Sequence, residues 1–268
     1  MSVYQDKVCV ITGAGSGIGR ALATQLATSG ARLAISDVDP IGLEATRALM
    51  PEAADVRAYS LDVSSRDAVF AHADEVLDDF GAAHYLFNNA GVTLAATIEH
   101  ATIEEYEWLL GINLWGPIYG TKAFLPAMLN QREGHIVNFS SVFGLVTVPT
   151  QSAYHISKFA MRGFTEGLSR ELDGTGVRAT SLHPGGIATN IGGGARFGAN
   201  AGATEREFMD TMETWLRTSS DDCAATILKG VERRKKRIVL GYGSRQLDVL
   251  SRLFPTHYGT ILKRVRGI

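Results

Sequence analysis

The chain of 268 residues has few cysteines and no clustered metal ligands. Its two cysteines, Cys9 and Cys223, form no CxxC pair, so a zinc or dithiol motif is not predicted. Cys9 lies in an apolar run and is expected to be a buried, reduced thiol. The seven histidines include no HExxH pattern, so we expect no metal site. His155 is expected to point away from its neighbour Tyr154, and His183 to lie in or behind the core.

The sequence also lacks a large net charge and a long apolar run. Its formal net charge is −2, which argues against general nucleic-acid binding. No apolar run approaches the roughly 20 residues of a membrane-spanning helix. The first residues, MSVYQDK, lack a signal-peptide core, so a cytoplasmic protein is expected.

What the sequence has is a regular alternation of strand-like and helix-like segments. Apolar strands that alternate with helices predict an α/β fold of the Rossmann type, a doubly wound parallel sheet of about seven strands in three layers. The length is typical of one domain, here residues 1–268. The predicted strands are 7–12, 31–37, 56–62, 84–91, 134–141, 177–184 and 238–241. The predicted helices are 17–29, 41–50, a segment capped by Ser64 or Ser65 and ending at Phe80, 102–111, 113–130 and 152–172.

Two segments depart from this alternation. Residues 190–217 combine a Gly- and Ala-rich stretch with a helix that carries Phe208, Met212, Trp215 and Leu216, and we expect a substrate lid there; a surface helix docked on the core is the alternative. Residues 242–268 form a basic tail with interspersed apolar residues. An exposed face with packing residues is favoured for this tail, and peripheral contact with an anionic membrane is the alternative.

A Gly-rich turn joins the first strand to the first helix. Glycines allow a tight turn and close approach to a pyrophosphate, and a helix N-terminus offers free N–H groups. An acid about twenty residues later, Asp37, completes a dinucleotide-binding pattern. The cofactor contacts expected from this turn are Gly13, Ser16, Gly17, Ile18 and Gly19.

Asp37 indicates which dinucleotide is bound. Its carboxylate can accept the ribose hydroxyls and would repel a 2′-phosphate, and no arginine at Ser16 or Val38 compensates, so NAD is favoured over NADP. The alternative for Asp37 is a helix N-cap, a role for which Asp39 competes. Asp62 and Val63 are expected near the adenine.

Tyr154 and Lys158 are four residues apart and therefore share one face of a helix. At roughly 5 Å and an effective dielectric constant near 20, the ammonium would lower the pKa of the phenol by about two units. This pair predicts proton transfer to and from an alcohol.

These motifs together resemble the short-chain dehydrogenase/reductase family, from Lys7 to about Leu240. They are TGxxxGxG at 12–19, NNAG at 88–91, Asn113 in INLWG, Ser141 in IVNFSS, Tyr154-x-x-x-Lys158, and Pro184-Gly185 followed by Thr189. The departures from the family pattern are the Gly-rich stretch at 185–204 and the basic tail.

The resemblance implies a role for each matching residue. Tyr154 would be the general acid/base, Lys158 would bind the nicotinamide ribose and lower the pKa of Tyr154, Ser141 would bind the substrate oxygen, and Asn113 would hold a water that links Lys158 to solvent. Ser141 is preferred over Ser140 by the usual offset to the tyrosine. The remaining cofactor contacts would be Asn88, Asn89, Ala90, Gly91, Pro184, Gly185, Ile187 and Thr189.

The resulting hypothesis is an NAD-dependent oxidoreductase that interconverts a secondary alcohol and a ketone. The pocket candidates are mostly apolar, which favours a lipophilic, cyclic or steroid-like substrate; Arg196 is the one candidate for a carboxylate clamp. The alternatives are a nucleotide-sensing binding protein with little turnover and, less favoured, a sugar-nucleotide epimerase or dehydratase. By resemblance, helices 113–130 and 152–172 would pair in a homotetramer. The pocket candidates are Thr93, Leu94, Val142, Phe143, Val148, Gly186, Phe197, Phe208, Met212 and Trp215.

Overall fold

The computed structural model describes residues 2–188 and 196–266. Its main sheet has seven parallel strands in the order β3-β2-β1-β4-β6-β7-β9, so the predicted seven-stranded Rossmann-type fold is confirmed. The strands are β1 Val8–Thr12, β2 Arg32–Asp37, β3 Val56–Ser60, β4 Tyr85–Asn88, β6 Gly134–Phe139, β7 Val177–Pro184 and β9 Arg237–Leu240.

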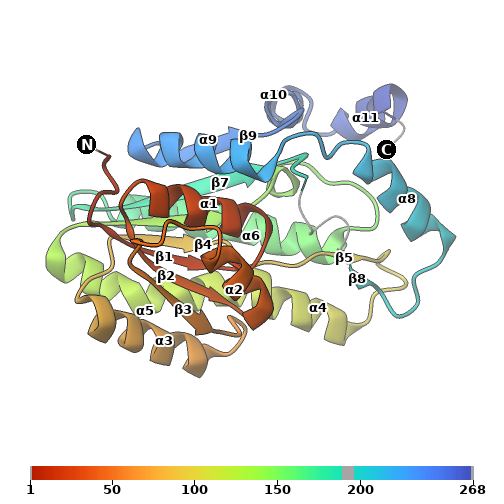
Figure 1. The fold of residues 1–268 in the computed structure, drawn as a ribbon. Helices are drawn as coiled ribbons and strands as arrows, with labels where there is room; N and C mark the ends of the chain where they lie inside the picture. The colour runs from red at the N-terminus through yellow and green to blue at the C-terminus, as the bar shows by residue number, and fades with distance from the viewer. Residues whose placement is uncertain (1, 189–195, 267–268) are drawn as a thin grey trace.

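Helices cover both faces of this sheet and give three layers (Figure 1). One face packs on α1 Gly17–Thr28, α2 Pro40–Arg47 and α9 Ser220–Glu232, through residues such as Leu22 and Ile227. The other face packs on α3 Arg66–Phe80, α5 Gly116–Gln131 and α6 Ser152–Glu171, through residues such as Phe124 and Leu168. Every residue of β1 and β6 is buried, as expected for strands covered on both sides.

The predicted boundaries hold where a local signal marks them. Ser65, rather than Ser64, caps α3 by accepting a hydrogen bond from the Ala68 N–H, and Gly81 ends this helix in the left-handed region at φ 75°. Three predicted strands end two or three residues early, at Ser60, Asn88 and Phe139.

Several elements were not predicted. A second, two-stranded sheet pairs β5 Leu94–Ala95 with β8 Arg196–Phe197. A π-helical segment, Gly111–Trp115, joins α4 Ile103–Leu110 to α5, and a short 3₁₀ helix covers Val142–Gly144. The helix after β8, α8 Ala203–Glu213, ends before Trp215 and Leu216, so the prediction that both lie on this helix is wrong.

The basic tail forms two helices, α10 Ser244–Leu253 and α11 Tyr258–Arg266. Leu247 and Leu262 are buried against Val142 and Val146, and the Tyr258 hydroxyl accepts a hydrogen bond from the Thr147 N–H at 3.0 Å. The apolar side of the tail therefore packs on the body of the protein. In Figure 1, α10 lies above β9, and α11 lies between α10 and α8.

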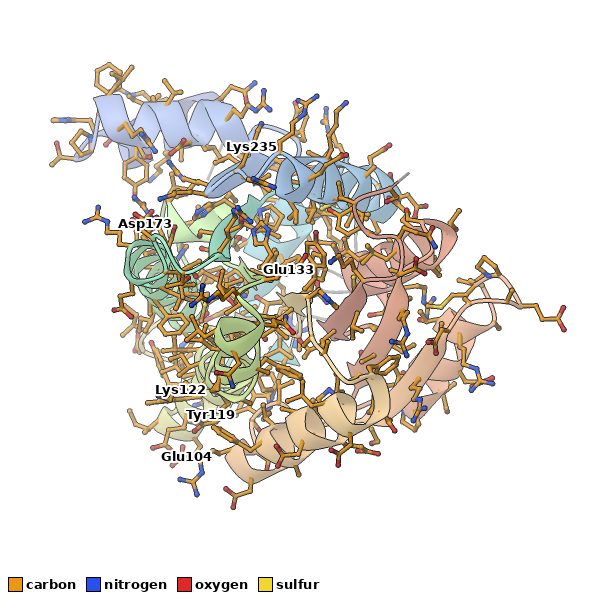
Figure 2. The ribbon with its side chains drawn as sticks, turned by 90° about the vertical axis from the view of Figure 1, so that its left-hand side faces the viewer. Glu104, Tyr119, Lys122, Glu133, Asp173 and Lys235 are labelled. Carbon is orange, nitrogen blue, oxygen red and sulfur yellow. The ribbon has the colours of Figure 1, made fainter. Side chains whose placement is uncertain are left out.

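The opposite edge of the sheet, where strands begin, carries charged side chains. Figure 2 views this side and labels Glu133, Asp173 and Lys235 in the turns before β6, β7 and β9. Two ion pairs lie there, Lys7 with Glu133 at 2.7 Å and Lys236 with Asp173 at 3.1 Å. Such solvent-exposed pairs contribute roughly 0–1 kcal/mol each to the stability of the fold. No helix in the described parts of the chain has the length and apolar character needed to span a membrane.

Candidate active site

A cleft of about 430 Å³ lies at the carboxyl ends of β1, β2, β3 and β4. In a parallel α/β sheet this is the edge where ligands bind, because the strand order reverses there. The structure brings together most of the predicted cofactor residues at this cleft. They are Gly13, Ser16, Gly17, Ile18, Asp37, Val38, Asp62, Val63, Asn89, Ala90 and Gly91.

The Gly-rich turn leaves little room for side chains. Gly13 and Gly17 have φ values of 67° and 53°, which favour glycine. A Cβ on Gly13 would lie 2.7 Å from the Cα of Ala90. Gly19 does not line the cleft. It packs against the carbonyl of Gly13, to which Asn89 Nδ2 also donates at 3.0 Å, so it shapes the turn from behind.

Asp37 lies at the end of β2 with its carboxylate at the cleft. It accepts hydrogen bonds from the backbone N–H of Gly15 at 2.8 Å and of Asp39 at 3.1 Å. Asp39, not Asp37, caps α2 by accepting from the Ile41 N–H at 3.0 Å, so the N-cap alternative for Asp37 is wrong. Among the described residues that line the cleft there is no lysine or arginine.

Asn88 differs from its neighbours in the NNAG segment. It is 2% exposed, and its Nδ2 donates to Asn138 Oδ1 at 2.8 Å inside the fold. Asn88 therefore joins β4 to β6 within the sheet. It does not line the cleft, so the expectation that it borders the cofactor is not supported. Sequence reasoning missed five further lining residues, to which only a strand-end position or a place beside Asn113 pointed: Leu61, Ser64, Val92, Trp108 and Ile112.

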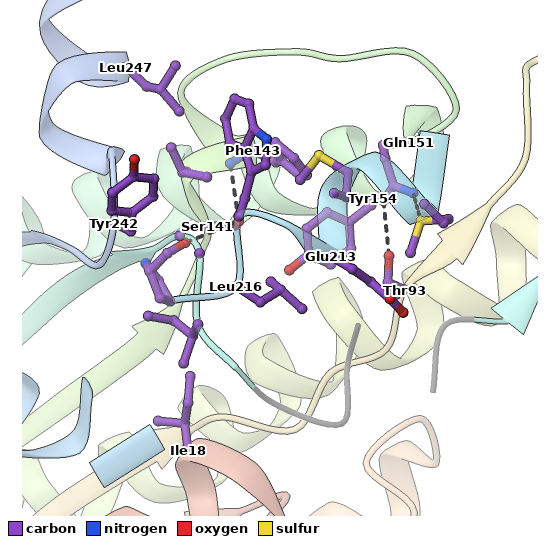
Figure 3. A pocket seen from close by; sticks show the side chains of 18 residues that line it. Ile18, Thr93, Ser141, Phe143, Gln151, Tyr154, Glu213, Leu216, Tyr242 and Leu247 are labelled. Carbon is purple, nitrogen blue, oxygen red and sulfur yellow. Dashed lines mark hydrogen bonds between the residues drawn. The ribbon is translucent and has the colours of Figure 1, made fainter. Parts of the chain in front are cut away.

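A second cavity, of about 160 Å³, adjoins the cleft and contains Ser141 and Tyr154 (Figure 3). Ile18 lines both cavities, so the two are neighbours at the start of α1. Ser141 follows β6 and caps the 3₁₀ helix by accepting from the Phe143 N–H at 3.1 Å. Ser140 instead donates its hydroxyl to the Lys158 carbonyl at 2.7 Å and is buried, so Ser141 is the serine that faces this cavity.

Lys158 and Asn113 lie beside Tyr154, on the side of the cleft. The Lys158 Nζ is 5.3 Å from the centre of the Tyr154 ring and donates to the Phe139 carbonyl at 3.0 Å. Asn113 is fully buried in the π-helical segment, and it exchanges two hydrogen bonds of 2.8 Å with the backbone of Val92. A Cβ placed on Gly91 would contact both Asn113 Oδ1 and Lys158 Nζ, so these two polar groups converge at the cleft.

Burial dominates the proton affinities of this cluster. It raises the pKa of Tyr154 to about 12, and a hydrogen bond with Ser141 only partly opposes that change. Burial also lowers the pKa of Lys158 to about 8. The net shift of the Tyr154 pKa is therefore upward, opposite to the fall that the spacing of Tyr154 and Lys158 predicts, because desolvation is the largest effect on this phenol.

The walls of the second cavity are largely apolar. Of the predicted substrate contacts, Thr93, Val142, Phe143, Gly186, Met212 and Trp215 line it. Pro184, Gly185 and Ile187, predicted to contact the cofactor, also lie in its wall. Leu216, which the sequence placed in the expected lid, also lines the cavity. Lining residues that the sequence did not single out come from the start of α6 and from the segments around α8 and α10: Gln151, Met209, Glu213, Tyr242 and Leu247.

Several predicted contacts lie elsewhere. Leu94 and Val148 do not line the cavity; Leu94 packs with Leu109 and Ala153. Phe208 also lies outside the lining, on α8, where Met209 and Met212 face the cavity instead. Thr189 and the first part of the predicted lid, 190–195, fall outside the described residues.

Two other side chains were assigned a place near the substrate and do not line the cavity. Phe197 lies in β8, where the Arg206 guanidinium sits over its ring. The Arg196 guanidinium lies over the Trp108 ring, 4.7 Å from its centre, so a carboxylate clamp at Arg196 is not supported.

His155 and His183 make the structural contacts that the sequence led us to expect. His155 hydrogen-bonds to the backbone of Val148, and His183 hydrogen-bonds to Ser181 and to the Ser141 carbonyl.

Comparison with known proteins decides the family. The model of the family described as short chain dehydrogenase matches residues 7–198. The chain belongs to the short-chain dehydrogenase family. It is 43% identical over 262 residues to the putative oxidoreductase SadH of Mycobacterium tuberculosis, covering 96% of this chain and 94% of that protein.

Solved structures of short-chain dehydrogenases share the fold. One from Burkholderia phymatum, in complex with NAD, has a TM-score of 0.83 and 33% identity, covering 89% of this chain and 90% of that one. A metagenomic short-chain oxidoreductase in complex with NADP has a TM-score of 0.72 and 27% identity, covering 89% and 100%. Relatives of this short-chain dehydrogenase thus bind either dinucleotide, and the choice depends on residues of the individual chain.

Proposed function

We propose that this protein is an NAD-dependent dehydrogenase that interconverts a lipophilic secondary alcohol and its ketone. The observation that most supports this proposal is that Ser141, Tyr154 and Lys158 lie close together where the cleft adjoins an apolar cavity. A dinucleotide in the cleft and an alcohol in the cavity would then meet at one tyrosine hydroxyl.

The cleft suits a dinucleotide without a 2′-phosphate. Ser16, at the N-terminus of α1, makes no side-chain cap, which leaves the first-turn N–H groups available to a pyrophosphate. Asp37 and Asp62 supply carboxylates for hydroxyl and amino groups, and no described cation lines the cleft to balance a phosphate. Arg20 is the nearest candidate in sequence, but its guanidinium is directed to Gly15, Gly42 and Thr46 and does not line the cleft.

Bound NAD would supply the two-electron acceptor, and the protein's own groups would handle the proton. Tyr154 would remove the proton from the alcohol oxygen, while the Ser141 hydroxyl donates a hydrogen bond to the same oxygen. Lys158, with a pKa near 8, can exchange a proton close to neutral pH, and Asn113 lies beside it as the next polar group. The positive nicotinamide would favour the phenolate of Tyr154, against the effect of burial.

The cavity favours an uncharged, apolar substrate. Its lining includes the apolar side chains Val142, Phe143, Met209, Met212 and Leu247, and no lysine or arginine lines its described part. Glu213 is exposed and lies in the wall, where its carboxylate would repel an anion. Small hydroxy acids should therefore be poor substrates.

We further propose a single-domain, cytoplasmic homotetramer. The outer faces of the π-helical segment and α6 expose large apolar side chains, with Trp115 49%, Ile156 49% and Phe159 39% exposed. Such a surface suits pairing with a second copy. The two cysteines are buried and free, which suits a reducing compartment.

A direct test is a screen of cyclic secondary alcohols with NAD and with NADP, followed by absorbance of the reduced nicotinamide. We expect turnover with NAD, best for apolar alcohols. Tight NAD binding without any turnover would instead support the alternative of a nucleotide-sensing protein.

A further inference from the structure

One wall of the apolar cavity carries a buried polar pair, Thr93 and Gln151. Gln151 is 3% exposed and Thr93 9% exposed, and both line the cavity. The Thr93 hydroxyl donates to the Gln151 carbonyl oxygen, with Oγ1 3.0 Å from Oε1. In Figure 3 this pair lies on one side of Tyr154, and Leu247 and Tyr242 lie toward the opposite side of the cavity.

The amide nitrogen of Gln151 has no strong acceptor in the described parts of the chain. Its one partner there is the thioether sulfur of Met209, at 3.9 Å from Nε2, and sulfur of this kind is a weak acceptor. Because Thr93 holds the carbonyl side of the amide, the two N–H donors stay on the other side. A buried amide donor without a good acceptor is unfavourable, and such groups usually have a partner.

The backbone before Gln151 is strained, and strained residues of this kind persist where the surrounding structure holds them and often lie at ligand sites. Thr150 has φ 63°, a value that a β-branched residue rarely adopts, and its buried hydroxyl has no partner among the described residues. The Thr150 carbonyl accepts from the Ala96 N–H at 2.9 Å, which ties this strained residue to the segment after β5. Gln151 is at the N-cap of α6, yet its side chain does not cap the helix. The amide is therefore not needed by the helix itself.

We propose that Gln151, oriented by Thr93, binds a second oxygen of the substrate. This inference rests on the proposed function, because it assumes that a first oxygen reacts at Tyr154 and Ser141. The substrate class then narrows to a lipophilic alcohol or ketone with a further uncharged acceptor, such as a carbonyl, ether or ester oxygen. The two amide N–H groups select for that acceptor, and the apolar walls select for the rest of the molecule.

The test compares ketones that differ only by one oxygen. The substrates are 2-, 3- and 4-methoxycyclohexanone, each paired with the ethylcyclohexanone that is substituted at the same ring position. The kcat/KM for reduction of each ketone is measured for wild type, Gln151→Met and Thr93→Val. At one ring position, wild type should prefer the methoxy ketone, and Gln151→Met should reduce that preference about tenfold, the effect expected of one hydrogen bond. Thr93→Val should reduce it by a smaller factor, because the amide can then rotate.

The measured quantity is the ratio of kcat/KM for the methoxy ketone to kcat/KM for the ethyl ketone. Comparing this ratio between wild type and a variant cancels the intrinsic difference in reactivity of the two ketones. Met212→Leu, in the apolar wall, is the matched control, and it should change kcat/KM for both ketones by the same factor. A methoxy-to-ethyl ratio that is equal in wild type and Gln151→Met at all three ring positions would overturn the proposal.

Failure of the proposed function would be seen separately, as no reduction of any ketone. In that case the binding of the same pairs is followed by the intrinsic tryptophan fluorescence of the protein, to which Trp215 in the cavity wall contributes. The proposal then requires that wild type bind one methoxy ketone more tightly than its ethyl partner, and that Gln151→Met abolish this difference in affinity. Equal affinities of wild type for both members of every pair would overturn it.

Discussion

At the scale of single residues, the site depends on how burial changes proton affinity. Tyr154 and Lys158 are close enough to interact, but burial raises the pKa of one and lowers that of the other. Spacing in the sequence gives the distance between such groups, whereas desolvation depends on residues from the whole chain. Ser141, Asn113 and the Gly-rich turn were predictable because each belongs to a local motif, and Gln151 was not because nothing local marks it.

The first prediction concerns pH. A phenol with a raised pKa is protonated at neutral pH, the form that donates a proton in ketone reduction, and oxidation needs the phenolate. At saturating cofactor, the rate of alcohol oxidation should therefore rise from pH 7 to pH 10, whereas ketone reduction should change little, because the Tyr154 phenol stays protonated over this range. Parallel initial rates in both directions check this, and an oxidation rate that is flat or falls with pH would contradict it.

The second prediction concerns Asp37. Asp37→Ser removes the carboxylate that would face a 2′-phosphate, so the ratio of kcat/KM for NADP to that for NAD should rise by roughly 10- to 100-fold, as expected when one close like charge is removed. Asp39→Asn is the matched control, since asparagine still caps α2 and lies two residues away. An unchanged cofactor ratio in Asp37→Ser would show that Asp37 does not determine cofactor choice.

At the scale of elements, the order of strands and helices was predictable, and the elements around the cavity were not. Strands β1 and β6 are short apolar runs, buried on both faces, that any periodicity analysis finds. The pairing of β5 with β8 joins two-residue segments about one hundred positions apart, too short to give a periodic pattern. The docking of the tail on the body of the protein was also not predictable, because only the structure shows which leucines of the tail are buried.

The third prediction tests that docking. Leu247 is 6% exposed and Val249, on the same helix, is 54% exposed. Leu247→Ala should lower the free energy of unfolding by about 2–4 kcal/mol and raise KM, because Leu247 also lines the cavity. Val249→Ala should change stability by less than about 0.5 kcal/mol. Denaturant titration measures both, and equal effects of the two substitutions would show that the tail does not pack as described.

At the scale of the whole molecule, the exposed apolar residues of α6 and the π-helical segment predict self-association. Phe159→Arg should shift the protein from a tetramer to smaller species in light scattering, because a buried unpaired charge is strongly unfavourable at such an interface. Ile41→Arg is the control, since Ile41 is 81% exposed on α2, which covers the other face of the sheet. Wild-type protein that is monomeric would contradict the proposed assembly.

The central claim is that Tyr154 transfers the proton in an NAD-dependent reaction. The measurement that tests it most directly is the absorbance of reduced nicotinamide with NAD and a cyclic secondary alcohol, for wild type and Tyr154→Phe side by side. We predict turnover by wild type, and in Tyr154→Phe a loss of at least about 10³-fold in kcat with NAD still bound. Turnover by Tyr154→Phe at a rate close to that of wild type would contradict the account.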